Sequence, residues 1–164
     1  MTAARTLLAA AAVFGALVIT TATSAAVLSS DERSLLQEMN RVRTAYGLPR
    51  LRVDRALQRA ARAHSREMLR REWFAHGSVG PRFLRFGIRS PVLGENLAWG
   101  VGENALPRAV VRSWLASPSH RRNLLDRSFR QVGVASAVGS FLGYAGASVI
   151  TTDFSGSEPS LSRP

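Results

Sequence analysis

The segment that decides the fold reads Trp114-Leu-Ala-Ser117-Pro118-Ser-His120-Arg-Arg-Asn123-Leu-Leu. Pro118 is typical of the first position of a helix, where its missing N–H would have no partner anyway. Ser117 is then the N-cap, and His120 falls in the first turn. A helix N-terminus carries partial positive charge and disfavours a charged imidazole. We therefore predict a short helix with a neutral histidine, the form that binds a metal or accepts a proton.

Two other polar motifs lie upstream, Trp73-Phe-Ala-His76 and Gly94-Glu95-Asn96-Leu-Ala98. Together with the opening segment they supply His76, Glu95 and His120 as the candidate site. Zinc sites use histidine and carboxylate ligands, and catalytic ones keep three protein ligands and a water. The spacing matches no compact metal motif. A zinc site, an acid–base role for Glu95, and plain hydrogen bonds or an Arg–Glu95 salt bridge all remain open.

Two amphipathic helices are expected in the first half of the chain. Ser29 and Glu32 have the spacing of a capping box, and Gly47 is a typical C-terminal stop. Asp54 is expected to cap the second helix, whose inner face carries His64 as a hydrogen-bonding core residue rather than a ligand. Its outer face carries a stripe of arginines, which is either a solvated surface or a binder of anionic surfaces. The stripe consists of Arg55, Arg59, Arg62, Arg66 and Arg70.

Polar and aromatic side chains outside the candidate site are assigned structural roles. Asn40 and Arg43, one turn apart, are expected to tie the first helix to a loop, and Asn123 to bracket another. The three tryptophans are expected to anchor the core, although Trp99 could edge a cleft. These are Trp73, Trp99 and Trp114.

The second half predicts more helix and then strands. Glycine and proline make residues 77–90 irregular, and Phe83 and Phe86 there form either an apolar lip for a lipid or part of the core. Asn104 is expected to cap a third helix. Residues 131–138 and 141–154 alternate in the manner of two antiparallel strands around a turn at Gly139-Ser140, and a third strand is expected near residues 95–100. The class is therefore α+β.

Residues 1–26 have the features of a cleaved signal peptide. Arg5 precedes an apolar stretch over residues 7–21, and small residues up to Ala26 suit cleavage. We expect a secreted or envelope protein with one domain at residues 30–155 and a flexible tail at 156–164. The chain holds no cysteine, so it folds without disulfides.

The formal net charge is +11, and all basic residues other than histidine are arginine. Such a surplus suits anionic cell-envelope polymers or lipids, although solubility alone also accounts for it. No nucleic-acid-binding motif occurs, so nucleic acid is not an expected partner.

Taken in order, the motifs resemble the CAP superfamily, also called SCP-like, and most of all its short bacterial branch. The resemblance spans about residues 32–154. It rests on Asn40-Arg-Val-Arg43, His64-Ser-Arg-Glu-Met68, Trp73-Phe-Ala-His76, Gly94-Glu95-Asn96-Leu-Ala98, the opening segment, Val132-Gly133-Val134 and Asp153-Phe154.

The resemblance implies a three-layer α-β-α sandwich around a central antiparallel sheet. It also implies a cleft lined by His76, Glu95 and His120, with any metal on the two histidines. Ser117 stands where larger relatives carry a second acid, which argues against a full acidic network. Relatives suggest three functions: a binding or interaction module at the envelope, a zinc-assisted hydrolase of peptides or wall material, and a lipid- or sterol-binding protein. No Gly-x-Ser-x-Gly motif supports a serine nucleophile.

Overall fold

The computed structural model describes residues 28–157, so the predicted signal peptide (1–26) and residues 158–164 of the predicted tail lie outside the described residues. The boundaries of the expected domain stay a prediction. The elements in chain order are α1 (Ser30–Ala45), β1 (Arg52–Val53), α2 (Arg55–Arg71), α3 (Val79–Arg85), β2 (Val92–Gly100), the 3-10 helix η1 (Gly102–Ala105), α4 (Pro107–Ala116), α5 (Pro118–Leu125), β3 (Phe129–Phe141) and β4 (Tyr144–Gly156).

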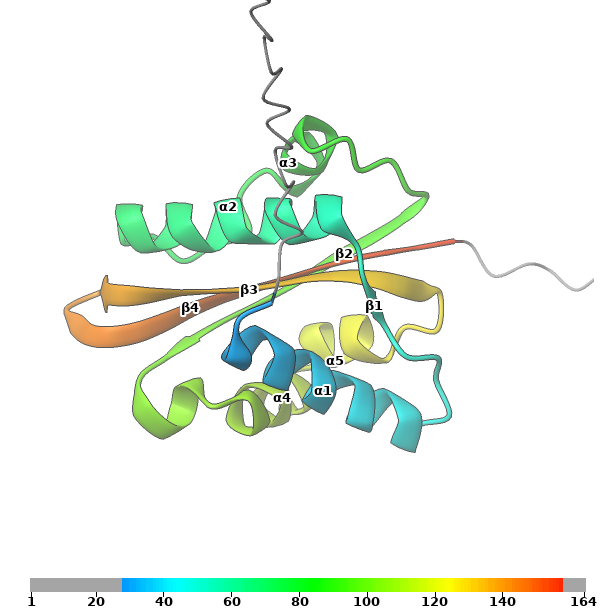
Figure 1. The fold of residues 1–164 in the computed structure, drawn as a ribbon, viewed down its shortest axis with the longest axis horizontal. Helices are drawn as coiled ribbons and strands as arrows, with labels where there is room; N and C mark the ends of the chain where they lie inside the picture. Colours follow the sequence, from blue (N-terminus) through cyan, green and yellow to red (C-terminus); the bar gives the residue numbers. More distant parts are fainter. Residues whose placement is uncertain (1–27, 158–164) are drawn as a thin grey trace, which may run out of the picture.

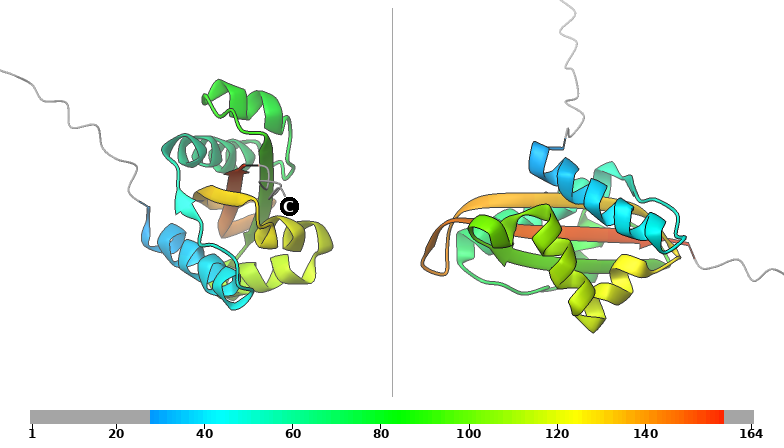
Figure 2. Two further views of the ribbon diagram at one scale, coloured as in Figure 1. Left: turned by 90° about the vertical axis from the view of Figure 1, so that its right-hand side faces the viewer. Right: turned by 90° about the horizontal axis from the view of Figure 1, so that it is seen from below.

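The elements form three layers, as predicted. The sheet has the strand order β1-β3-β4-β2, with α2 and α3 over one face and α1, α4 and α5 over the other (Figure 1). Figure 2 shows the same layering from two further sides. Strands β2, β4 and β3 pair antiparallel, whereas the short strand β1 joins β3 in parallel. Strands β1 and β2 are thus the two edges of the sheet.

The first two helices begin where the sequence predicts. Ser29 and Glu32 form the reciprocal capping box, and the Asp54 carboxylate accepts hydrogen bonds from the amides of Ala56 and Leu57. These contacts satisfy amides that have no partner inside the helix. The apolar face of α1 then packs with α4 and β3 in the main core.

Arg43 and Asn40 have the tying role that was expected of them. The side chain of Arg43 is fully buried and donates to the carbonyls of Pro49, Leu124 and Phe129 and also to that of Asp126. Asn40 exchanges two hydrogen bonds with the backbone of Leu51. Burying a guanidinium is costly unless its N–H groups find acceptors, and these four carbonyls supply them. Arg43 therefore fixes α1 to the connection between α5 and β3.

Two helix predictions are wrong. Residues 77–90 contain the helix α3, because Pro81 falls in its first turn, where proline costs no hydrogen bond. The helix predicted to begin at Asn104 instead begins at Pro107, after the separate 3-10 turn η1. Proline at the first position defines this start more strongly than the asparagine does.

The three predicted strands exist, and the last two pair antiparallel as predicted, but their ends differ from the prediction. Strand β3 continues through Gly139 and Ser140, and the turn lies at Leu142-Gly143. Both turn residues have positive φ, of 49° and 83°, as a two-residue hairpin requires. Strand β1 was not foreseen, because two residues carry no periodic signal.

The three tryptophans differ in how deeply they are buried. Trp114 is 1% exposed and anchors the main core, as predicted, whereas Trp73 is 40% exposed and is not a core anchor. Trp99 is partly buried against a smaller cluster that includes Phe141. Within residues 28–157, no helix is long and apolar enough to cross a membrane.

Gly133 sets the distance between α2 and the sheet. A Cβ at this position would overlap the backbone carbonyl of Leu57 in α2. The next residue, Val134, exchanges backbone hydrogen bonds with the side chain of Gln58. We expect Gly133→Ala to lower the free energy of unfolding by about 3 kcal/mol, because two backbones would have to separate. Chemical denaturation measures this.

Gly80→Ala is the matched control, because a Cβ on this glycine meets nothing within 4 Å. We expect it to leave stability unchanged or slightly raised, since alanine favours helix over glycine. An equally small effect of Gly133→Ala would contradict the close approach of α2 to β3.

Candidate functional site

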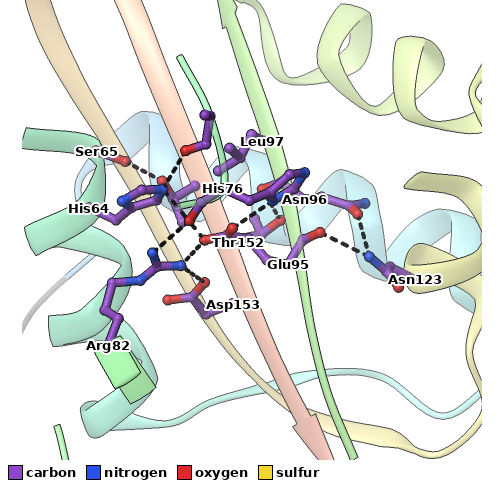
Figure 3. Close-up of polar contacts among 12 residues, drawn as sticks. His64, Ser65, His76, Arg82, Glu95, Asn96, Leu97, Asn123, Thr152 and Asp153 are labelled. Carbon is purple, nitrogen blue, oxygen red and sulfur yellow. Dashed lines mark hydrogen bonds and ion pairs between the residues drawn. The ribbon is translucent and has the colours of Figure 1, made fainter. Parts of the chain in front are cut away.

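The predicted site residue Glu95 lies on the edge strand β2, directly opposite Asp153 on β4. Residues opposite each other in antiparallel strands share a face of the sheet. Both carboxyl groups therefore point to the face covered by α2 and α3. His64 from α2, His76 from the loop after α2, and Arg82 from α3 complete the cluster (Figure 3).

Glu95 is enclosed by positively charged or hydrogen-bonding groups. Its side chain is 2% exposed, and Oε1 lies 2.7 Å from Nδ1 of His76. The guanidinium of Arg82 donates to Oε2, and Nε2 of His64 lies 3.8 Å from the same oxygen. Both carboxyl oxygens of Glu95 therefore contact neighbouring side chains and help to fix their positions.

Asp153 is the second buried acid of the site. Its side chain is completely buried, and Nη2 of Arg82 lies 3.8 Å from Oδ1. No hydrogen-bond donor among the described residues reaches either oxygen. Two carboxylates cannot donate to each other, so the contact between Asp153 and Glu95 becomes a hydrogen bond only when one of them holds a proton.

One guanidinium therefore balances two buried carboxyl groups. Burial raises the pKa of Glu95 to about 7, although the charge of Arg82 opposes this. Burial and the charge of Glu95 raise the pKa of Asp153 well above its ordinary value. Arg82 can neutralise one carboxylate, and the second is stable in this dry environment as the acid. The pair titrates as one unit.

His64 has the structural role that was expected. It is 2% exposed, and its Nε2 lies 3.1 Å from the carbonyl oxygen of Ala75. Burial lowers the pKa of His64 to about 4, and the charge of Arg82 adds to this. A neutral ring therefore spans α2 and the loop that carries His76, and it helps to place that loop.

His120 and His76 approach the edge strand from opposite faces of the sheet. The carbonyl of His120 accepts from Asn96, whereas Asn123 in the same helix donates to the backbone of Glu95 and to Asn96. Asn123 thus brackets strand β2 rather than a loop. These bonds fasten α5 to the strand that carries Glu95.

The His120 ring lies beside Ser117. Nδ1 of His120 lies 2.9 Å from Oγ of Ser117, the N-cap residue, which makes no capping bond of its own. Burial lowers the pKa of His120, and the charge of His76 adds to this. Burial and Arg82 also lower the pKa of His76, while Asp153 opposes them.

The histidines suit a metal, but the ligand set is small. Both Nδ1 atoms are occupied by oxygen partners, the arrangement that orients metal-binding histidines and leaves Nε2 for the metal. Within residues 28–157, no group of three or more His, Cys, Asp or Glu is arranged to hold an ion. The described residues therefore offer two imidazole Nε2 atoms and lack the three-ligand set of a catalytic zinc.

Sequence reasoning missed Asp153 and Arg82 as members of this site. Asp153 entered only as part of a motif, although an acid within the predicted strand 141–154 is itself a signal of a buried polar cluster. Arg82 looked like one of many arginines in a loop. Only its position on α3 places it over the carboxyl pair.

The comparison with protein families decides the identity of the domain. The model of the cysteine-rich secretory protein family, CAP, matches residues 36–154. The chain belongs to the CAP family. The protein YkwD of Bacillus subtilis is 33% identical over 120 residues, which cover 70% of this chain and 46% of that protein. This CAP chain thus spans less than half the length of the curated relatives it matches.

Two solved structures share the fold. An extracellular protein with an SCP domain from Bacillus anthracis has a TM-score of 0.61 and 28% identity, over 74% of this chain and 39% of that one. An outer surface protein of Borrelia burgdorferi has a TM-score of 0.64 and 20% identity, over 79% and 96%. The three layers described above are therefore those of the CAP sandwich.

Arg82→Gln tests the balance of charge in the site. We expect it to lower the free energy of unfolding by about 3 kcal/mol at pH 8, because a buried carboxylate loses its cation. Glu95 has a raised pKa in the folded state, so its contribution to stability is full below pH 4.5 and is lost as the pH rises through 7. Without Arg82 this loss is larger, so the variant should recover much of its stability near pH 5.

Thermal or urea unfolding across this pH range measures the effect. Arg85→Gln is the control on the same helix, because Arg85 is exposed and lies over the ring of Phe86. It should cost little at any pH. A loss for Arg82→Gln that does not change between pH 5 and 8 would contradict the charge-balance explanation.

Proposed function

We propose that this CAP protein is secreted through its predicted signal peptide and works as a binding module at the cell envelope. Its ligand contacts the site formed by His76, Glu95 and His120. The location is supported by the Bacillus anthracis relative, which is described as extracellular, and by the Borrelia burgdorferi neighbour, described as an outer surface protein.

The observation that carries this proposal is the enclosure of Glu95. Its carboxyl group is bound by Arg82 and His76 and is 2% exposed, so it orients the His76 ring instead of standing free as a base. His76 itself has a side chain that is 54% exposed. The site therefore presents imidazole groups that are held at Nδ1 and whose lowered pKa favours the neutral ring, with the charged groups behind them.

A zinc-assisted hydrolase is the second candidate. It is favoured by the two Nε2 atoms, which make no hydrogen bond to any described residue, while both Nδ1 atoms are held. When bound, a divalent metal such as zinc would supply a Lewis acid. His76 and His120 would hold it, and Ser117, in place of a second acid, would orient the His120 ring. A base comparable to a free glutamate is missing from this arrangement.

A lipid- or sterol-binding role has less support. Of the apolar side chains in residues 77–90, Phe83 is fully buried and Ile88 is 7% exposed, so they belong to the core rather than to a lip. Phe86 is partly buried against the same cluster, and Leu84 alone of the four is largely exposed.

Retention on isolated cell envelopes tests the binding function. We expect the full chain to be retained and the double variant His76→Ala/His120→Ala to lose at least about tenfold in affinity, a difference of 1.4 kcal/mol or more. Arg112→Gln, an exposed change on α4, is the control and should be retained. Metal-dependent turnover of a peptide or wall substrate that Glu95→Gln abolishes would overturn the proposal in favour of the hydrolase.

Titration with zinc tests the metal site separately. Calorimetry should show one weak site that is lost in His120→Ala. Ser117→Ala should weaken it about tenfold, because the His120 ring loses its orienting partner. Ser119→Ala is the matched control, since the Ser119 hydroxyl is exposed and lies 3.4 Å from that of Ser117, not beside the His120 ring. Zinc affinity that is unchanged in His120→Ala would exclude this metal site.

A further inference from the structure

A second surface with a distinct chemistry lies at the opposite edge of the sheet. An open groove of about 1480 Å³ runs beside β1, at the end of the molecule where β1 is labelled in Figure 1. It is bordered by α1, by residues 87–91, and by the ends of β3 and β4. None of its lining residues belongs to the histidine site.

Five arginines from four segments of the chain surround this groove. All five are exposed, and none forms an ion pair with a carboxylate of residues 28–157. The side chains that do make bonds donate to backbone carbonyls, those of Leu28 in one case and of Arg127 and Phe129 in the other. The five are Arg33, Arg50, Arg52, Arg89 and Arg130.

The groove holds almost no negative charge to offset them. Asp54 is the one acid among its described lining residues, and its carboxylate is occupied in capping α2. Unpaired charges of one sign around a concave, low-dielectric surface concentrate the potential and attract anions. Part of the net positive charge of the chain is therefore concentrated around this groove.

The groove is built on rigid parts of the fold. Its floor includes Leu51, Leu57 and Ile88, which are 3%, 1% and 7% exposed. Arg52 lies on β1, and Arg33 lies on α1 above the capping box. Guanidinium groups on fixed elements bind phosphate in a bidentate manner with little loss of entropy.

We propose that this groove binds a segment of a linear polymer that carries repeated phosphate groups. The volume exceeds the roughly 300–1,000 Å³ of small-molecule pockets, and a single phosphate could meet only some of the five arginines, which come from four segments. A membrane surface is the weaker match, because the groove is concave and its apolar residues are mostly in the floor. The inference deepens the proposed function, since it gives the envelope-binding module a polymer partner.

The test uses the full chain and inorganic polyphosphate of defined length as the probe. We expect binding that weakens steeply with added salt, because the contacts are charged and solvent-accessible. The triple variant Arg50→Gln/Arg52→Gln/Arg89→Gln should raise the Kd about tenfold or more. The corresponding Arg→Lys triple should retain part of the affinity, since it keeps the charge but not the planar fork.

The matched control removes the same charge elsewhere. Arg59, Arg66 and Arg70 on α2 are exposed and form no ion pair with a described carboxylate. Arg59→Gln/Arg66→Gln/Arg70→Gln should leave the Kd within about twofold. An equal loss in both triples would show that net charge alone drives binding and would overturn the proposal.

Three further outcomes would also overturn it. These are no binding of polyphosphate, inorganic phosphate binding as tightly as the polymer, and phosphatidylglycerol vesicles or polyglutamate binding more tightly than polyphosphate. A variant that ends at Ser157 keeps the described groove and should bind as the full chain does. Zinc titration of Arg50→Gln/Arg52→Gln/Arg89→Gln distinguishes the two surfaces and should match that of the unmodified chain. Failure of the histidine site would, in turn, leave polyphosphate binding intact.

Discussion

Two carboxyl groups and one guanidinium are enclosed between β2, β4 and α3, and the histidine site depends on how their charge is balanced. Arg82 contacts Glu95 directly and lies 3.8 Å from Asp153. Because a single cation cannot neutralise two carboxylates, the pair retains a proton up to about neutral pH. The same cluster holds the ring of His76 through Glu95, and burial together with the charge of Arg82 lowers the pKa of His64 and of His76.

This buried cluster also connects separate parts of the fold. Arg82 fastens α3 to the sheet, His64 fastens α2 to the loop of His76, and Asn123 fastens α5 to β2. Each bond uses a polar group that would be costly to bury alone. The site is thus positioned from both faces of an edge strand, without any disulfide.

The two edges of the sheet carry different chemistry. Strand β2 lies beside the imidazoles of His76 and His120 and carries the buried acid Glu95, whereas strand β1 borders a groove with unpaired arginines. Because α2 and α1 cover the faces, the edges and their flanking loops are where ligands can reach the protein. An envelope polymer held at one edge would keep the other edge close to the cell surface.

Local sequence determined the elements whose signals lie within a few residues: the capping box at Ser29, the Asp54 cap, the start of α5 at Pro118, and the alternation of the strands. The ordered motifs identified the family and with it His76, Glu95 and His120. Tertiary structure alone placed Asp153 opposite Glu95, brought Arg82 over both, added β1, and moved the hairpin turn to Leu142-Gly143. The reason is that strand register and helix docking bring together residues far apart in the chain, and no local pattern encodes which charges will share one buried space.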